Sequence, residues 1–185
     1  MDLEQKSIER IKMASEMSLH HYGKPLICTY SGGKDSDVML ELFKRSGVPF
    51  EVHNSHTTVD APPTVYHIRD IFRDLELAGI KCDIDYHRQP GGHFLTMWNL
   101  IPNKLVPPTR TARYCCKELK EGDGANRMIA TGVRWAESVK RRGREVFEYV
   151  ASAKDRRIAA SMEIMLVNDN DTSGHISELL KRCCV

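Results

Sequence analysis

Apolar positions recur along the chain with two different periods, and the order of these segments predicts the fold class. Short runs rich in β-branched, aromatic or other apolar residues are typical of strands, and they are residues 26–30, 48–53, 80–86 and 128–133. Segments with apolar residues three or four positions apart are typical of helices, and they are 2–22, 36–46, 62–79, 93–100 and 113–120. Strands that alternate with helices predict an α/β fold with a parallel sheet and helices on both faces.

Length and composition favour one soluble domain over the whole chain, residues 1–185. Apolar residues make up 41% of the chain and charged residues 28%, which is typical of a soluble globular protein, and no apolar run approaches the length needed to span a membrane. The net charge of +2 is too small to indicate nucleic-acid binding, although basic residues cluster at 140–144 and 154–157. The charged N-terminus does not resemble a signal peptide, so we expect a cytoplasmic protein whose six cysteines are reduced.

The segment SGGKDS, residues 31–36, joins the first predicted strand to the following helix, and we call it the SGGKDS loop. Its two glycines can adopt backbone angles closed to other residues and leave no side chain between the main chain and a ligand. A helix N-terminus offers unpaired N–H groups and partial positive charge, to which Lys34 adds a full charge. The loop therefore predicts a binding site for an anion such as phosphate or sulfate.

Other phosphate-binding and metal-binding motifs do not match the chain. A Walker A loop would need glycine at Cys28 and serine or threonine at Asp35. The dinucleotide pattern GxGxxG and the nucleophile elbow GxSxG are absent from the sequence. The segment that begins at Asp169 starts like a calcium loop, but its twelfth position is Leu180 rather than glutamate.

The complete string SGGKDS resembles the signature of the PP-loop, the pyrophosphate loop of N-type ATP pyrophosphatases and sulfonucleotide reductases. The segments PPTRTARYCCKELKE (107–121) and TGVRWAESVKRR (131–142) further resemble the PAPS (phosphoadenosine phosphosulfate) reductase family. The resemblance covers about residues 24–145, and residues 146–185 form a weaker tail. It implies a Rossmann-like sheet of the adenine nucleotide alpha hydrolase-like type.

The resemblance also implies which residues bind the nucleotide. They come from the SGGKDS loop and from the strand end near residue 132: Ser31, Gly32, Gly33, Lys34, Asp35, Ser36, Gly132, Arg134, Ser138, Arg141 and Arg142. Among them, Lys34 and Arg134 are the predicted catalytic residues. At Arg134, the planar fork of arginine suits phosphate or sulfate oxygens. His56, which follows the second predicted strand, is a further residue that we expect near the ligand.

Two pairs of adjacent cysteines raise the question of a metal centre. In the branch of the family that uses adenosine phosphosulfate, a Cys-Cys pair holds a 4Fe-4S cluster together with a later CxxC pair. The matching residues here are Cys115 and Cys116 with Cys183 and Cys184, although the later pair is adjacent rather than CxxC. Four thiolates suit an iron–sulfur cluster or zinc, while free thiols are the alternative.

The reductive members of the family carry a cysteine nucleophile on a C-terminal tail, beyond the point that matches residue 185. We therefore expect a shortened relative, a fragment of a longer protein, or a member with different chemistry.

The resemblance implies an enzyme of sulfur metabolism, an oxidoreductase that binds PAPS or adenosine phosphosulfate and transfers the sulfur group to a thiol, with a thiol reductant protein as its partner. The alternative is an ATP pyrophosphatase that uses Mg²⁺ and acts in tRNA thiolation or DNA phosphorothioation. A third hypothesis is a nucleotide-binding subunit without turnover. Which adenine nucleotide binds is open at this point.

Overall fold

The structure is a computed structural model that describes residues 3–89, 91–120, 127–132, 146–151 and 158–163. The chain divides into two compact units. Unit 1 comprises Met1–Val52 with Gly124–Val185, and unit 2 comprises His53–Asp123. The single domain expected for residues 1–185 stays a prediction.

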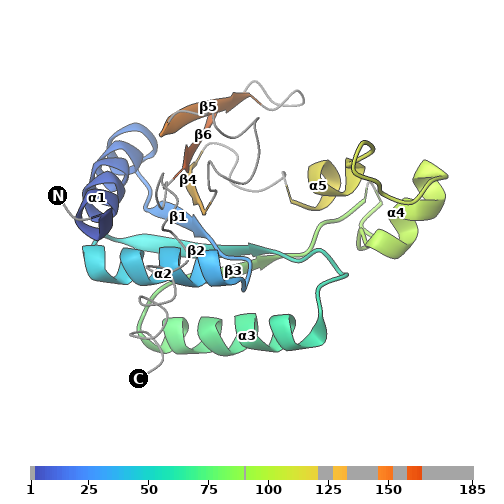
Figure 1. Ribbon diagram of the computed structural model, residues 1–185, viewed down its shortest axis with the longest axis horizontal. Coiled ribbons are helices and arrows are strands. Elements are labelled where there is room, and N and C mark those ends of the chain that lie inside the picture. Colours follow the sequence, from blue (N-terminus) through green and yellow to red (C-terminus); the bar gives the residue numbers. More distant parts are fainter. Residues whose placement is uncertain (1–2, 90, 121–126, 133–145, 152–157, 164–185) are drawn as a thin grey trace. The chain divides into compact units, whose positions relative to one another are not determined.

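The elements follow the predicted alternation of helices and strands (Figure 1). Their bounds are α1 Leu3–Tyr22, β1 Leu26–Thr29, α2 Lys34–Ser46, β2 Phe50–Ser55, α3 Pro62–Leu77, β3 Cys82–Asp85, α4 Met97–Lys104, α5 Tyr114–Leu119, β4 Met128–Thr131, β5 Phe147–Ala151 and β6 Ile158–Glu163. The strand order in the sheet is β3-β2-β1-β4-β6-β5. Since β4 pairs in parallel with both β1 and β6, the predicted α/β class with parallel strands is confirmed.

Three features differ from the sequence-based predictions. The tail contributes two unpredicted strands, and β5 runs antiparallel to β6. Strand β2 begins after Pro49, because proline has no N–H to donate to a strand ladder. The short helix predicted at 93–100 lies instead at Met97–Lys104, and Thr96 caps it by exchanging hydrogen bonds with Asn99. None of the helices that the structure describes has the length and apolarity needed to cross a bilayer.

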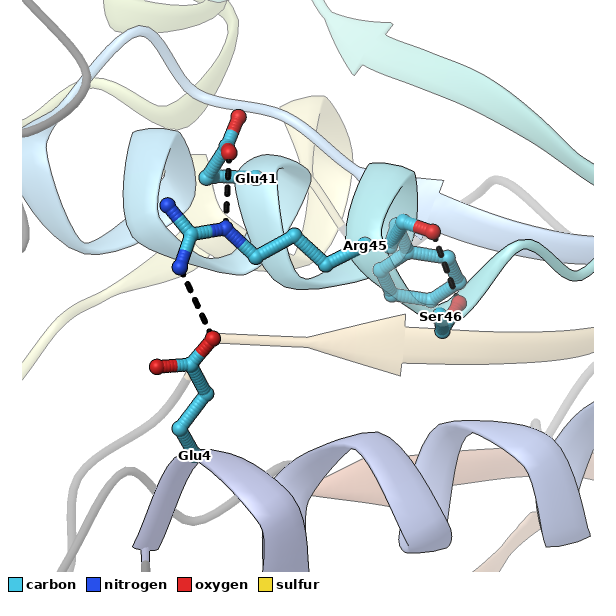
Figure 2. A network of polar contacts seen from close by, with 5 residues as sticks. Glu4, Glu41, Arg45 and Ser46 are labelled. Carbon is cyan, nitrogen blue, oxygen red and sulfur yellow. Dashed lines mark hydrogen bonds and ion pairs between the residues drawn. The ribbon is translucent and has the colours of Figure 1, made fainter.

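In unit 1, α1 and α2 pack against each other and against β1. The buried side chains of α1 are small or aliphatic: Ser7, Ile11, Ala14, Ser15 and Ser18. On the surface, the Arg45 guanidinium of α2 donates at 2.8 Å to Glu41 and at 2.8 Å to Glu4 of α1 (Figure 2). These hydrogen bonds raise the pKa of Arg45, but the partly exposed pairs stabilise the fold by only about 0.5 kcal/mol each.

A second, more buried ion pair joins the start of β4 to β2 in unit 1. The Arg127 Nη2 group donates at 2.8 Å to the Glu51 carboxylate and at 2.8 Å to the main-chain oxygen of Pro25. Both charged side chains are only 12% exposed. Arg127 thus connects three segments that lie far apart in the sequence.

Unit 2 has its own small apolar cluster, in which Met97 and Leu100 of α4 pack with Leu119 of α5. His87, just after β3, bridges to this cluster, since its Nε2 lies 2.8 Å from the Leu119 main-chain oxygen. Its Nδ1 lies 3.1 Å from the Asp85 carboxylate. Residues around the end of β3 are therefore held to α5 by polar contacts as well as by apolar packing.

Candidate anion-binding site

The SGGKDS loop is a tight connection between β1 and α2 in unit 1. Gly32 has a φ of +70°, a left-handed conformation that glycine adopts without strain. Gly33 is extended and forms the N-cap of α2, where its carbonyl accepts the first helical hydrogen bond from Asp37 N–H at 3.0 Å. The first-turn N–H groups of a helix have no partner within the helix, so this turn presents hydrogen-bond donors beside Lys34.

The buried hydroxyl of Ser36 fixes the conformation of this turn. Its Oγ accepts a hydrogen bond from Gly33 N–H at 3.1 Å and donates one to the Gly33 carbonyl at 2.7 Å. The Ser31 hydroxyl donates to Ser36 Oγ at 3.3 Å. The loop is therefore ordered by contacts among its own residues, and a ligand would meet a preorganised main chain.

Tyr30 and Asp37 tie the end of β1 to the first turn of α2. The Tyr30 hydroxyl, in a side chain that is only 2% exposed, donates to the Asp37 carboxylate. Burial, followed by the contact with Asp37, raises the pKa of Tyr30, so the phenol stays protonated and keeps its role as donor. No local sequence pattern indicates this contact, because Tyr30 is already explained as part of a buried strand and Asp37 as part of a helix start.

Lys34 is the exposed first residue of α2. A cation at a helix N-terminus opposes the helix dipole, which costs the helix a few tenths of a kcal/mol up to about 1 kcal/mol. An anion bound at the turn would reverse the sign of this interaction, because Lys34 and the helix N-terminus would then both attract it. The position of Lys34 is thus unfavourable for the helix alone and favourable for anion binding.

Gly132, directly after β4, lies beside this turn. A β-carbon on Gly132 would stand 3.6 Å from the Asp35 carbonyl oxygen and 3.8 Å from the Met39 sulfur. The structure thus brings Gly132 together with the SGGKDS loop, as the sequence predicts for neighbouring parallel strands. The other residues predicted for this strand end lie outside the described residues: Arg134, Ser138, Arg141 and Arg142.

The cysteines predicted as metal ligands lie in different surroundings. Cys115 packs against the apolar cluster of α4 and α5, whereas Cys116 Sγ lies 3.4 Å from the guanidinium of Arg113. Cys183 and Cys184 lie outside the described residues. Within the part of the chain that the structure describes, no three His, Cys, Asp or Glu residues group as metal ligands, and an iron–sulfur cluster stays a prediction.

The segment after β2, in unit 2, is held by local hydrogen bonds. Thr57 Oγ1 donates to Asp60 at 2.6 Å, and Thr58, which has a φ of +66°, accepts from Met97 N–H at 2.9 Å. His56 donates its main-chain N–H to Asp85 at 3.0 Å, and its ring contacts Tyr86. The expected position of His56 near a nucleotide stays a prediction.

Comparison with known proteins places this geometry among known folds. No protein-family model matches the chain, and no curated protein has significant sequence similarity to it. Among solved structures, PAPS reductase from Candida auris in a phosphate complex has a TM-score of 0.55 at 13% identity, over 95% of this chain and 80% of that one. NMN synthetase from Francisella tularensis has a TM-score of 0.52 at 11% identity, over 100% and 72%.

FMN adenylyltransferase from Candida glabrata, in complex with FMN and an ATP analogue, has a TM-score of 0.53 at 14% identity. The match covers 96% of this chain but 56% of the adenylyltransferase. The chain has the adenine nucleotide alpha hydrolase-like fold. In this fold, which PP-loop proteins share, the SGGKDS loop occupies the turn between the first strand and its following helix.

The two glycines of the loop allow a matched test of its geometry. We expect Gly32→Ala to lower the free energy of unfolding by about 1–2 kcal/mol, because a β-carbon is strained at positive φ. We expect Gly33→Ala to cost less than about 0.5 kcal/mol, the usual range for surface changes, since Gly33 has an ordinary φ and its nearest contact would be 3.7 Å from the new carbon. Urea unfolding of both variants checks this, and equal losses would contradict the assigned turn.

Proposed function

We propose that the chain binds an adenine nucleotide and that the SGGKDS loop holds its phosphate or sulfate group. The observation that carries the proposal is the preorganised turn at the start of α2, with Gly32 at positive φ, Ser36 bonded to Gly33, and Lys34 exposed. The shared fold supports nucleotide binding, because the similar structures belong to the PP-loop superfamily. Gly132 supports it further by lying beside the same turn.

The reaction that we propose is transfer of the sulfur group of PAPS or adenosine phosphosulfate to a thiol. Lys34 would neutralise charge on the phosphate and sulfate oxygens, and Arg134 would bind them through two parallel hydrogen bonds. An attacking thiolate would form a bond to sulfur while the bond from sulfur to the phosphate oxygen breaks, and its electron pair would remain on the nucleotide phosphate. A thiolate of the reductant protein would then attack the sulfur of the first thiol, so that a disulfide forms between the two thiols and the transferred group leaves as sulfite.

An ATP-dependent reaction is the second candidate. It is favoured by the shared fold with an adenylyltransferase whose structure contains an ATP analogue. In that case the SGGKDS loop would hold the pyrophosphate portion of ATP, and Mg²⁺ bound with the nucleotide would neutralise part of the phosphate charge. The described residues do not assemble an iron–sulfur site.

A thermal-shift comparison of ATP, adenosine phosphosulfate and PAPS, each with and without Mg²⁺, separates these candidates. We expect the largest increase in melting temperature with a sulfonucleotide and no dependence on Mg²⁺. The largest increase with ATP and Mg²⁺, accompanied by release of pyrophosphate, would replace the proposed reaction by the ATP-dependent one. Binding of a nucleotide without any turnover would indicate a nucleotide-binding subunit.

Arg134 provides a test of the proposed anion contacts. If its guanidinium binds a phosphate or sulfate through two parallel hydrogen bonds, Arg134→Lys should weaken nucleotide binding nearly as much as Arg134→Ala, because lysine cannot reproduce the planar fork. Isothermal titration of both variants with the preferred nucleotide measures this. Full affinity of the lysine variant would show that charge alone matters at this position.

A further inference from the structure

Aromatic and cationic side chains form a continuous row on unit 2. We call the row formed by His56, Tyr86, Phe94 and Arg88 the aromatic strip. The rings of His56 and Tyr86 lie 5.2 Å apart between centroids, and those of Tyr86 and Phe94 lie 6.2 Å apart, both pairs edge to face. The Arg88 guanidinium lies 4.3 Å from the centre of the Phe94 ring. The strip is therefore a chain of successive ring contacts that ends in a positive charge.

Three of the four side chains of the aromatic strip are exposed, and His56 is half-buried. The exposed fraction is 42% for Tyr86 and 52% for Phe94, and Arg88 is exposed as well. A single exposed ring on a protein surface is ordinary, but several exposed rings in one row form an apolar patch, and such patches mark interaction sites. A planar partner that stacks on the rings would cover this surface.

The backbone around the strip is held in place before any partner binds. Residues 87–89 pair antiparallel with residues 93–95: Leu95 N–H donates to the His87 carbonyl, and Gln89 N–H donates to the His93 carbonyl. The Arg88 side chain donates at 2.8 Å to the Gly92 carbonyl, which keeps its guanidinium over Phe94. The Phe94 carbonyl accepts from Asn99 of α4. Binding would therefore cost little ordering of these side chains.

The charge of the surrounding segment indicates the chemistry of the partner. Residues 86–120 contain six Lys and Arg residues but only one acidic residue, Glu118, whereas the whole chain carries a net charge of only +2. All six basic side chains are exposed: Arg88, Lys104, Arg110, Arg113, Lys117 and Lys120. Glu118 pairs with Lys104, and the carboxylate next to the strip, Asp85, lies against His87. The segment is thus strongly basic and is suited to a polyanion.

We propose that the aromatic strip and the exposed basic residues of segment 86–120 bind single-stranded nucleic acid, with unpaired bases stacked on the rings and phosphates near the basic residues. Stacking platforms combined with positive charge are how proteins hold single strands without reading their sequence. A duplex cannot offer its base faces to Phe94 and Tyr86, since they are stacked on neighbouring base pairs. An acidic protein would complement the basic charge but would not provide planar bases to stack on the rings. The inference does not rest on the nucleotide proposed for the SGGKDS loop.

Fluorescence anisotropy with a labelled oligothymidylate of about 20 nucleotides tests the inference directly, because sites of this kind accept any sequence. We expect binding that weakens steeply as salt is raised. We expect Phe94→Leu, which keeps apolar bulk and removes the π face, to weaken binding roughly tenfold. Tyr86→Phe keeps the ring and should bind within about twofold of the parent chain.

Two matched controls make the outcome specific. Tyr66 of α3 is 63% exposed and lies in the same unit outside the strip, so Tyr66→Leu should bind like the parent chain. Lys34→Ala should also bind like the parent chain, since it alters only the proposed nucleotide site. If Phe94→Leu fails to fold by circular dichroism, Arg88→Gln replaces it, with the same expected loss. Absence of binding at low salt, equal binding of a duplex, unchanged binding of Phe94→Leu or Arg88→Gln, or loss of binding in Lys34→Ala would each overturn the inference.

Discussion

Replacing Lys34 with alanine is expected to weaken nucleotide binding by about 1.5–3 kcal/mol, the range for hydrogen bonds to charged groups, which is roughly a tenfold to 150-fold loss of affinity. Lys34 is exposed at the start of α2, so its removal leaves no cavity. Isothermal titration of the variant and the parent chain with ATP, adenosine phosphosulfate and PAPS measures the loss.

Lys44→Ala is the matched control for this experiment. Lys44 is also exposed and lies on the same helix, but in its last turn, away from the SGGKDS loop. We expect its affinity to equal that of the parent chain, while the net charge changes by the same amount as in Lys34→Ala. Equal affinities of both variants for every nucleotide would exclude the loop as the anion site.

Replacing Arg127 with alanine is expected to lower the free energy of unfolding by about 3–5 kcal/mol, the cost of removing one partner of a buried ion pair. The variant would leave the Glu51 carboxylate, in a side chain that is 12% exposed, without its guanidinium partner. It would also remove the donor to the Pro25 carbonyl. Urea unfolding followed by circular dichroism measures the change at neutral pH.

Arg45→Ala provides the comparison for Arg127→Ala. Arg45 also contacts two acceptors, Glu4 and Glu41, but its side chain is 30% exposed, and solvent screens the pairs. We expect a loss of about 0.5–1 kcal/mol. The double variant Arg127→Leu with Glu51→Leu should recover much of the stability, since it removes both charges together. A loss for Arg127→Ala no larger than for Arg45→Ala would show that burial does not strengthen this pair.

Elements with strong local periodicity could be predicted from the sequence. The SGGKDS loop lies between a short apolar run and an amphipathic segment, so strand, turn and helix follow from neighbouring residues alone. Gly132 could be placed beside the loop because carboxyl ends of parallel strands meet at one edge of a sheet. The pairing of residues 87–89 with 93–95 could not be predicted, since the proline and glycines in this part of the sequence indicate a break in regular structure without specifying which segments pair.

Contacts between distant polar residues could not be predicted, because no local pattern encodes them. The Arg127–Glu51 pair spans 76 positions, and either residue alone looks like an ordinary surface charge. The contact of Tyr30 with Asp37 spans only seven positions, yet each residue already has a sufficient local explanation. The aromatic strip likewise joins His56 to Tyr86, which lies thirty positions later along the chain. Strands β5 and β6 are absent from the sequence-based predictions, although Phe147, Tyr149 and Val150 of β5 are residue types typical of strands.

The position of β3 bears on how the protein behaves at high concentration. It ends the strand order at one side, and an edge strand exposes main-chain groups that can pair with another chain. This edge is short, since β3 has only four residues, Cys82–Asp85, and two of them are aspartates. A second copy that added its own β3 in register would place its two aspartates beside those of the first copy, and like charges opposite each other on neighbouring strands are destabilising. The sheet is therefore protected on this side against growth into aggregates.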